Sequence, residues 1–309
     1  MKIRPLLTGL ASNIPGLYNN FARGTGGSNS ASYCYDVWIN HLTLLHQVGL
    51  QKIPNAIAEL GPGDSLGIGL AALLSGANEY YALDVRKYSN TEMNLKVLDE
   101  LVDVFRNRAS ISSSNTPTKD IITEERLMES LREDRIDAIR RAIADLESDS
   151  ISRSGKIKIK YIVPWNDPNV LEPQSVDLIY SQAVLEHVDD LEAVYRAMSI
   201  WLKTGGYMSH QIDFQSHNMT KEWNGHWACN EFIWRIARGK KPYLLNRQPY
   251  SAHVDLQEKY GFKIIFTRCT PADASGIARK QLATRWRNMT DSDLCCAGAL
   301  IQVVLQDRK

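Results

Sequence analysis

The segment Ala56–Gly67 reads AIAELGPGDSLG and joins a short apolar run to a glycine-rich turn. We predict a buried strand over Ala56–Leu60, because a short apolar run that ends at glycine and proline is typical of a strand inside a parallel sheet. Gly61 and Gly63 would let the backbone turn tightly and approach a ligand closely. The helix expected after the turn, Ile68–Leu74, would offer unpaired N–H groups to an anionic group of that ligand.

Strands and helices alternate on both sides of this segment. The same criteria predict further strands at 80–85, 156–163, 176–180, 207–212, 262–267 and 299–305. Helices are predicted at 35–48, 91–107, 119–147 (one helix or a pair of helices) and 191–203, with a loop at 110–117. Asp189 or Asp190 would begin the helix at 191–203, and Gly205 and Gly206 would end it. Such alternation specifies a parallel sheet with helices on both faces, and we expect the last two strands to close it as an antiparallel pair. The predicted fold is α/β, a doubly wound seven-stranded sheet whose ligand binds at the carboxyl ends of the strands.

Three segments lie outside the regular alternation. We predict a helical cap or lid over residues 1–55 and one domain over 56–309. Within that domain, residues 88–155 form a helical insertion, because 119–147 is rich in charge yet keeps an apolar stripe. Residues 214–250 are rich in aromatic and polar side chains, and we expect them to cap the substrate side.

The composition excludes several classes of protein. The chain has 309 residues with 36 Lys+Arg against 35 Asp+Glu, and a formal net charge of +1 offers nucleic acid no large cationic field. No apolar run reaches the roughly 18 residues that span a bilayer, and the apolar stretch after Lys2 and Arg4 stops at Thr8, which argues against a signal peptide. Five cysteines without a CxxC pair indicate neither a disulfide framework nor a zinc site. We expect a cytoplasmic protein with reduced thiols and a small-molecule partner, in an oligomeric state that the sequence leaves open.

Acidic residues at two strand ends narrow the class of ligand. Asp84 ends the second strand, 21 residues after Gly63, where an acid that accepts ribose hydroxyls is expected in a nucleoside-binding α/β unit. Glu59, directly before the glycines, would repel a pyrophosphate but suits an ammonium group. A dinucleotide loop of the form GxGxxG requires a third glycine at the position of Leu66. A nicotinamide-dependent reductase is therefore the weakest alternative.

Four motifs occur in the order found in one enzyme family. They are Glu59–Gly63, Ala82–Asp84, Val176–Val188 (VDLIYSQAVLEHV) and Trp201–Tyr207 (WLKTGGY). In these four motifs and in their order, the sequence resembles the class I, Rossmann-like S-adenosylmethionine-dependent methyltransferases, which are transferases of the EC 2.1.1 class. The resemblance runs from residue 56 to about 213. The insertion and residues 214–250 depart from it, so the acceptor stays open.

The resemblance implies S-adenosylmethionine as the cofactor and a role for each residue that would hold it. Glu59 and the backbone of the glycine loop would hold the methionine moiety, and Asp84 would take the ribose hydroxyls. Adenine would pack after the third strand, and the sulfonium would lie at the end of the fourth. The full predicted set is Glu59, Leu60, Gly61, Pro62, Gly63, Asp84, Pro164, Trp165, Ser181 and Gln182.

The residues after the fourth and fifth strands bear on the atom that is methylated. Tyr180–Ala183 lacks the Asn/Asp-Pro-Pro-Tyr/Phe pattern of the family's members that methylate amino groups of nucleic acids. We therefore expect transfer to oxygen, with a general base to remove the proton. Imidazole titrates near neutrality and an aspartate can orient it, so the candidates are His210, Asp213 and His217. Together with His226 these residues could instead hold a divalent metal, but their spacing has no firm metal pattern and we predict none.

Two further inferences concern His187 and the acceptor. His187 is expected to be structural, at the start of a helix. The aromatic and polar residues of 214–250 suit a sugar, and this part of the chain resembles bacterial methyltransferases of surface-glycan and polysaccharide biosynthesis. The aromatic residues could instead form a small core of their own. The predicted function is O-methylation of a sugar, a glycan or another small polar acceptor; the alternatives are a natural-product or lipid-quinone methyltransferase and a catalytically silent binding protein.

Overall fold

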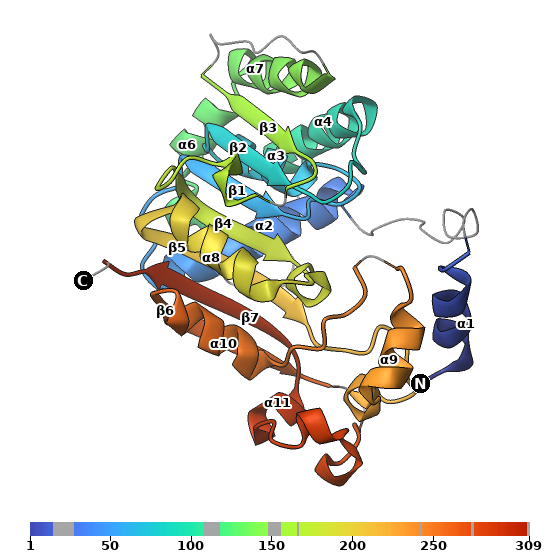
Figure 1. Cartoon of the computed structure of the whole chain (residues 1–309). Coiled ribbons are helices and arrows are strands. Elements are labelled where there is room, and N and C mark those ends of the chain that lie inside the picture. Colours follow the sequence, from blue (N-terminus) through green and yellow to red (C-terminus); the bar gives the residue numbers. More distant parts are fainter. Residues whose placement is uncertain are drawn as a thin grey trace.

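The computed structural model describes residues 1–14, 28–107, 118–147, 156–165, 167–241, 243–272 and 275–307. In this part of the chain seven strands form one sheet (Figure 1) in the order β3-β2-β1-β4-β5-β7-β6. The strands are β1 (Ala56–Leu60), β2 (Glu79–Leu83), β3 (Lys158–Ile162), β4 (Val176–Gln182), β5 (Leu202–Asp213), β6 (Phe262–Pro271) and β7 (Cys296–Leu305). The predicted seven-stranded α/β fold is confirmed.

The sheet is parallel except at one strand. The pairs β1–β2, β1–β4, β2–β3 and β4–β5 are parallel, whereas β7 lies antiparallel between β5 and β6. The predicted antiparallel pairing of the last two strands is confirmed. The chain reverses its direction across the sheet between β1 and β4, and such a switch point leaves a crevice at the carboxyl ends of the strands.

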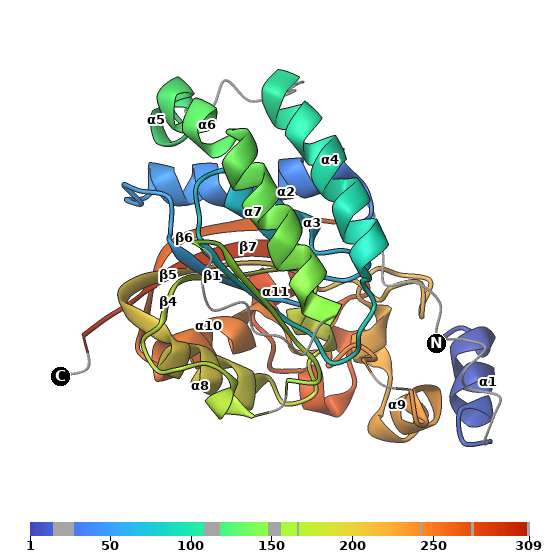
Figure 2. The ribbon, with the colours of Figure 1, turned by 90° about the horizontal axis from the view of Figure 1, so that it is seen from above.

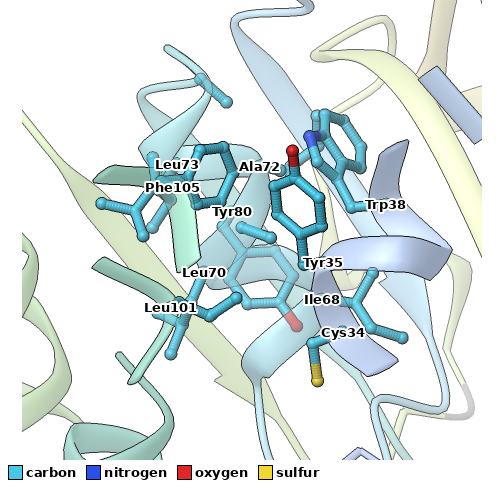
Figure 3. Packing of buried hydrophobic residues seen from close by; sticks show 14 of the residues in the cluster. Cys34, Tyr35, Trp38, Ile68, Leu70, Ala72, Leu73, Tyr80, Leu101 and Phe105 are labelled. Carbon is cyan, nitrogen blue, oxygen red and sulfur yellow. The ribbon is translucent and has the colours of Figure 1, made fainter. Parts of the chain in front are cut away.

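One face of the sheet is covered by the helices that precede β4 (Figure 2). They are α2 (Ala31–Gln47), α3 (Gly67–Leu74), α4 (Thr91–Asn107), α5 (Thr118–Ile121), α6 (Glu124–Ser130) and α7 (Glu133–Ala144). Tyr35 of α2 meets Phe105 of α4 edge to face at 4.9 Å, and the Trp38 indole donates a hydrogen bond to Ser75 Oγ at 2.8 Å. Figure 3 shows this packing, with Tyr80 of β2 beneath α3. Helix α2 is therefore part of the sheet's own core.

The opposite face is covered by α8 (Leu191–Trp201) and α10 (Tyr250–Lys259), as Figure 2 shows. Asp190 begins α8 as predicted, because its Oδ1 accepts the backbone N–H of Ala193 at 2.9 Å. The fully buried Trp201 ends the helix inside this second core. Helix α11 (Asp291–Cys295) leads into β7.

A third, smaller core lies beyond the end of the sheet (Figure 1). Helix α1 (Ile3–Ala11) packs there on α9 (Glu231–Arg238). The contact is close at Gly9, where a Cβ would overlap the backbone of α9. The buried apolar residues of this third core are Met219, Cys229, Trp234, Ala237 and Leu245. Single turns of 3-10 helix complete the described chain at Asp145–Glu147, Pro168–Val170, Leu185–His187, Gly225–Ala228, Arg279–Gln281 and Thr284–Trp286.

The chain departs from the predicted pattern of elements in two segments. The stretch 119–147 is not continuous, because Thr123 accepts the N–H of Arg126 and begins a new helix, and the chain breaks again before α7. The predicted loop at 110–117 lies outside the described residues. Gly205 and Gly206, expected to end the helix that begins at residue 191, instead lie inside β5. No helix of the described chain is long and apolar enough to cross a bilayer.

Candidate functional site

The described residues enclose a cavity of about 690 Å³ at the carboxyl ends of the parallel strands. This volume is typical of a small-molecule site. Its lining comes from the ends of β1, β2 and β4 and from the start of α8. Residues that lie elsewhere in the chain complete it, among them Ser28, Tyr33, Trp165, Pro168 and Tyr243. The residues that matter below are Leu60, Gly61, Pro62, Gly63, Asp84, Trp165, Gln182, Val184, His187 and Tyr243.

The glycine-rich turn after β1 forms one wall of the cavity. Gly61 and Gly63 have φ values of 63° and 78°, which side chains rarely adopt. A Cβ at Gly61 would lie 2.7 Å from Cγ2 of Val184, which also lines the cavity. Glycine is therefore required at position 61 both for the turn and for the close approach of Val184.

The start of α3 is less open than the sequence predicted. The N–H of Leu66 donates to Asn94 Oδ1 at 2.9 Å, and the N–H of Gly67 donates to Ser65 Oγ at 3.1 Å. Ser65 is in turn held by Ser28, whose Oγ accepts its N–H at 2.9 Å. These amides already have partners, so they are not the anion site that we expected.

Asp84 lies at the end of β2 and faces the cavity. Its Oδ1 accepts the N–H of Val85 at 2.7 Å. Burial raises the pKa of Asp84, while backbone N–H groups, including that of Gly63, act in the opposite direction. Trp165 lines the same cavity, with its ring edge to face with Trp201 at 5.4 Å. Pro164 is exposed and lies outside the lining.

Glu59 is fully buried inside β1 and does not line the cavity. Its carboxylate accepts a hydrogen bond from the Tyr80 hydroxyl, and Tyr180 faces it from β4. Burial raises the pKa of Glu59 to about 8, against the effect of these hydroxyl groups. The predicted direct contact with the methionine moiety is therefore not what this geometry offers.

The end of β4 separates two residues that were predicted to act together. Gln182 lines the cavity, and its Oε1 lies 3.3 Å from Nε2 of His41. Ser181 is completely buried, and its Oγ lies 2.8 Å from Nδ1 of His210 on β5. Burial lowers the pKa of His210 to about 3. The structure thus places His210 in the core, away from the cavity, because its strand register directs it toward Ser181.

Asp213 and His217 do lie together, after β5. His217 Nε2 is 3.1 Å from Asp213 Oδ2. Burial acts to raise the pKa of Asp213, but the hydrogen bonds from His217 and from the Gln215 backbone hold it below its usual value. The His217 ring lies 5.1 Å, centroid to centroid, from the ring of His187, which lines the cavity. The pair therefore borders the cavity through His187.

His187 is a cavity residue that sequence reasoning missed. Burial and the nearby His217 lower its pKa to about 4, and burial raises the pKa of its neighbour Glu186 to about 8. The only signal in the sequence was the position of Glu186 and His187, in the turn that follows the fourth strand. A histidine there reads equally well as a helix start, which is how we interpreted it.

The aromatic residues of 214–250 are mostly buried. Trp223 and Trp227 stack edge to face at 5.9 Å, and Trp234 belongs to the small core under α1. His226 is buried against Trp227, and burial lowers its pKa to about 3. Of the aromatic side chains predicted to face a sugar, Tyr243 lines the cavity. Most of these aromatic side chains are thus part of hydrophobic cores: Trp223 and Trp227 join the core under α8 and α10, and Trp234 joins the small core under α1.

Comparisons with known proteins find one family match and several solved structures of low sequence identity. Residues 155–209 match the methyltransferase domain family. Solved structures of similar arrangement include an S-adenosylmethionine-dependent methyltransferase from Methanosarcina mazei, at 12% identity over 86% of this chain and 98% of that one, with a TM-score of 0.45. Another, from Mesorhizobium loti, is 16% identical over 84% and 95%, with a TM-score of 0.40.

A third is phosphoethanolamine N-methyltransferase 2 of Haemonchus contortus with bound S-adenosyl-L-methionine, at 14% identity over 90% of this chain and 58% of that one, with a TM-score of 0.43. A search of curated protein sequences finds no match. The methyltransferase-domain match covers β3, β4 and most of β5. The chain thus contains a segment that matches the methyltransferase domain family.

Proposed function

We propose that the chain transfers a methyl group from S-adenosylmethionine to an oxygen atom of a small polar acceptor, with a sugar hydroxyl as the first class to test. The observation that carries the choice of oxygen is the hydrogen-bonded pair Asp213–His217 beside His187 at the cavity. A hydroxyl nucleophile gains from such a pair, because its proton must leave as the new bond forms.

The orientation that we propose for the cofactor follows the order of the strand ends that line the cavity. Asp84 and Trp165 lie toward β2 and β3, where the ribose and adenine would bind. The glycine turn after β1 would face the methionine moiety, and Gln182 at the end of β4 would lie nearest the sulfonium. Glu59 would act only at a distance, from beneath the turn.

The reaction balances without any further reactant. The acceptor oxygen attacks the methyl carbon, the carbon–sulfur bond breaks, and the sulfonium becomes a neutral thioether. The acceptor proton passes to the His217–Asp213 pair and then to water. Positioning supplies much of the rate, because transfer from a sulfonium requires an in-line approach.

The test is Asp213→Asn, which keeps the shape of the side chain and removes its charge. We expect kcat to fall by about 10²-fold, in the range of general-base effects, with unchanged affinity for S-adenosylhomocysteine. Acceptor methylation is followed with radiolabelled cofactor over a panel of sugars and nucleotide sugars. Asp255→Asn, an exposed residue of α10, is the control. Full activity of Asp213→Asn would exclude the pair from proton removal.

A lipid-like acceptor is the second candidate, because α1 exposes an apolar face. Ile3, Leu7 and Leu10 of α1, and Ile14 just after its end, are each more than half exposed and recur at helical spacing. Such a face suits a helix that lies on a lipid surface. Polyprenyl phenols therefore belong in the acceptor panel, and methylation of these alone would replace the polar acceptor by this one.

A further inference from the structure

Three side chains form a cluster at the edge of the cavity. Glu186, His187 and His217 each offer one potential ligand atom, and these atoms all lie within 4.8 Å of one another. Glu186 and His187 come from the single turn after β4, and His217 comes from the loop after β5. Adjacent parallel strands thus bring them together.

Two residues of the cluster, Glu186 and His187, carry buried polar atoms without partners in the described part of the chain. Glu186 is 3% exposed, and among the described residues neither of its carboxylate oxygens has a hydrogen-bond partner of normal geometry; the backbone amides of Glu186 and Asp213 are the nearest donors. Nδ1 of His187 is also buried and without a partner there. Buried polar groups without partners are costly and rare, and a bound ion is one of the few explanations.

In both histidines of the cluster, one ring nitrogen already has a hydrogen-bond partner, which leaves the other free to bind an ion. His217 uses Nε2 to reach Asp213 at 3.1 Å, which leaves Nδ1 as its coordinating atom. His187 makes a hydrogen bond to the backbone of Tyr243, which leaves the unpartnered Nδ1. Metal-binding histidines characteristically use their other nitrogen in this way, on a carboxylate or a backbone carbonyl.

The two backbone segments that carry the cluster are fixed in place. Asn246 holds the turn after β4, where its N–H donates to the Glu186 carbonyl at 2.8 Å and its side chain donates to the Leu185 and Val188 carbonyls at 2.7 and 2.9 Å. His217 and Asn218 both have positive φ values, 46° and 63°. Such conformations persist only where the surroundings impose them, and they cluster at functional sites.

We propose that Glu186, His187 and His217 bind a divalent first-row transition-metal ion at the edge of the cavity, with Asp213 orienting His217. Two imidazoles and one carboxylate favour such an ion over calcium or magnesium, which prefer sites made of oxygen atoms alone. Three protein ligands leave open positions for water or for an acceptor oxygen.

The role of the ion rests on the proposed function, whereas the binding site does not. An acceptor hydroxyl on an open position would lose its proton to water more easily, and His217 would then assist proton removal through the ion instead of accepting the proton itself. The methyl carbon would still be attacked by the same oxygen.

The test is titration of the full-length protein, stripped with a chelator, with Co²⁺, whose visible absorption reports its ligands. We expect one Co²⁺ per chain, and at least tenfold weaker binding in Glu186→Gln and in His217→Ala. Glu79→Gln, at the other end of the sheet, and His46→Gln are matched controls that should bind like the wild type. The partly exposed His217 can be replaced at little risk to folding, so this variant decides the question if Glu186→Gln fails to fold.

Absence of Co²⁺ binding by the wild type, or equal binding by all variants, would overturn the proposal. S-Adenosylhomocysteine is titrated into the same samples to keep the two proposals apart. Loss of Co²⁺ binding with cofactor binding retained supports the metal site. Stoichiometric Co²⁺ binding without methylation of any acceptor would leave the metal site standing and count against the proposed acceptor alone.

Discussion

Asp84 and Glu59 lie at the ends of neighbouring strands, yet only one of these carboxylates can reach a ligand. Asp84 follows β2 and faces the cavity, with the Val85 N–H 2.7 Å from its Oδ1. Glu59 lies within β1 and is enclosed by Tyr80 and Tyr180. We therefore assign the ribose hydroxyls to Asp84 and an indirect role to Glu59.

Removing the Asp84 carboxylate should weaken the binding of S-adenosylhomocysteine. Asp84→Ala deletes the proposed acceptor of the ribose hydroxyls, and hydrogen bonds to a charged group are worth about 1.5–3 kcal/mol, or at least tenfold in Kd. Calorimetric titration measures the change, with Asp255→Ala as the control. An unchanged Kd would remove Asp84 from the site.

The sequence predicted the residues of the cavity better where local chemistry determines them. Gly61, Gly63 and Asp84 follow from turn geometry and strand-end position, and all three line the cavity. The burial of His210 in the core and the position of His187 at the cavity could not be predicted in this way. They depend on Ser181 across the β4–β5 pair and on the loop that brings His217 toward His187.

At the scale of elements, the turn between β1 and α3 should tolerate no side chain at Gly61. Gly61→Ala adds a strained φ and a Cβ 2.7 Å from Val184, whereas Gly205→Ala adds only the strained φ, since nothing lies within 4 Å of its Cβ. We expect Gly205→Ala to cost about 1 kcal/mol of unfolding free energy and Gly61→Ala about 2–4 kcal/mol. Chemical denaturation measures both, and equal losses would show that the turn does not press on Val184.

Most elements could be predicted because their apolar patterns are local. The bounds of β1 and α4 are as predicted, and those of β2, β4 and α8 differ by one or two residues. The boundary between α8 and β5 could not be predicted. Gly205 and Gly206 resemble a helix end, but pairing with β4 extends β5 back to Leu202, next to Val176. Tertiary pairing outweighs local preference there.

On the scale of the whole molecule, the N-terminal region divides between two structures. Helix α2 packs into the core of the sheet, whereas α1 packs on α9 beyond the sheet's end. The cap that we propose at the N-terminus therefore comprises α1 with α9, whereas α2 belongs to the core of the sheet. The sequence could not predict this contact, because the two helices are far apart along the chain.

Glu59 should make the stability of the whole protein depend on pH. Its pKa is about 8 in the folded protein against 4.5 when exposed, so between these values the folded state keeps a proton that the unfolded state loses. The free energy of unfolding should therefore fall as pH rises from 4.5 to 8, by about 1.4 kcal/mol per pH unit from this group alone.

Glu59→Gln cannot ionise and should lose this contribution. Denaturation of both proteins from pH 5 to pH 8 should show the variant gaining stability relative to the wild type as pH rises. A constant difference between the two across this range would mean that Glu59 is ionised in the folded protein.

The central claim is that the cavity binds S-adenosylmethionine. Its most direct test is calorimetric titration of the purified protein with S-adenosylhomocysteine, with NAD titrated in parallel. We expect one molecule of S-adenosylhomocysteine per chain with micromolar affinity, and no heat from NAD. Absence of S-adenosylhomocysteine binding, or binding of NAD in its place, would contradict the account and favour a silent binding protein or a reductase.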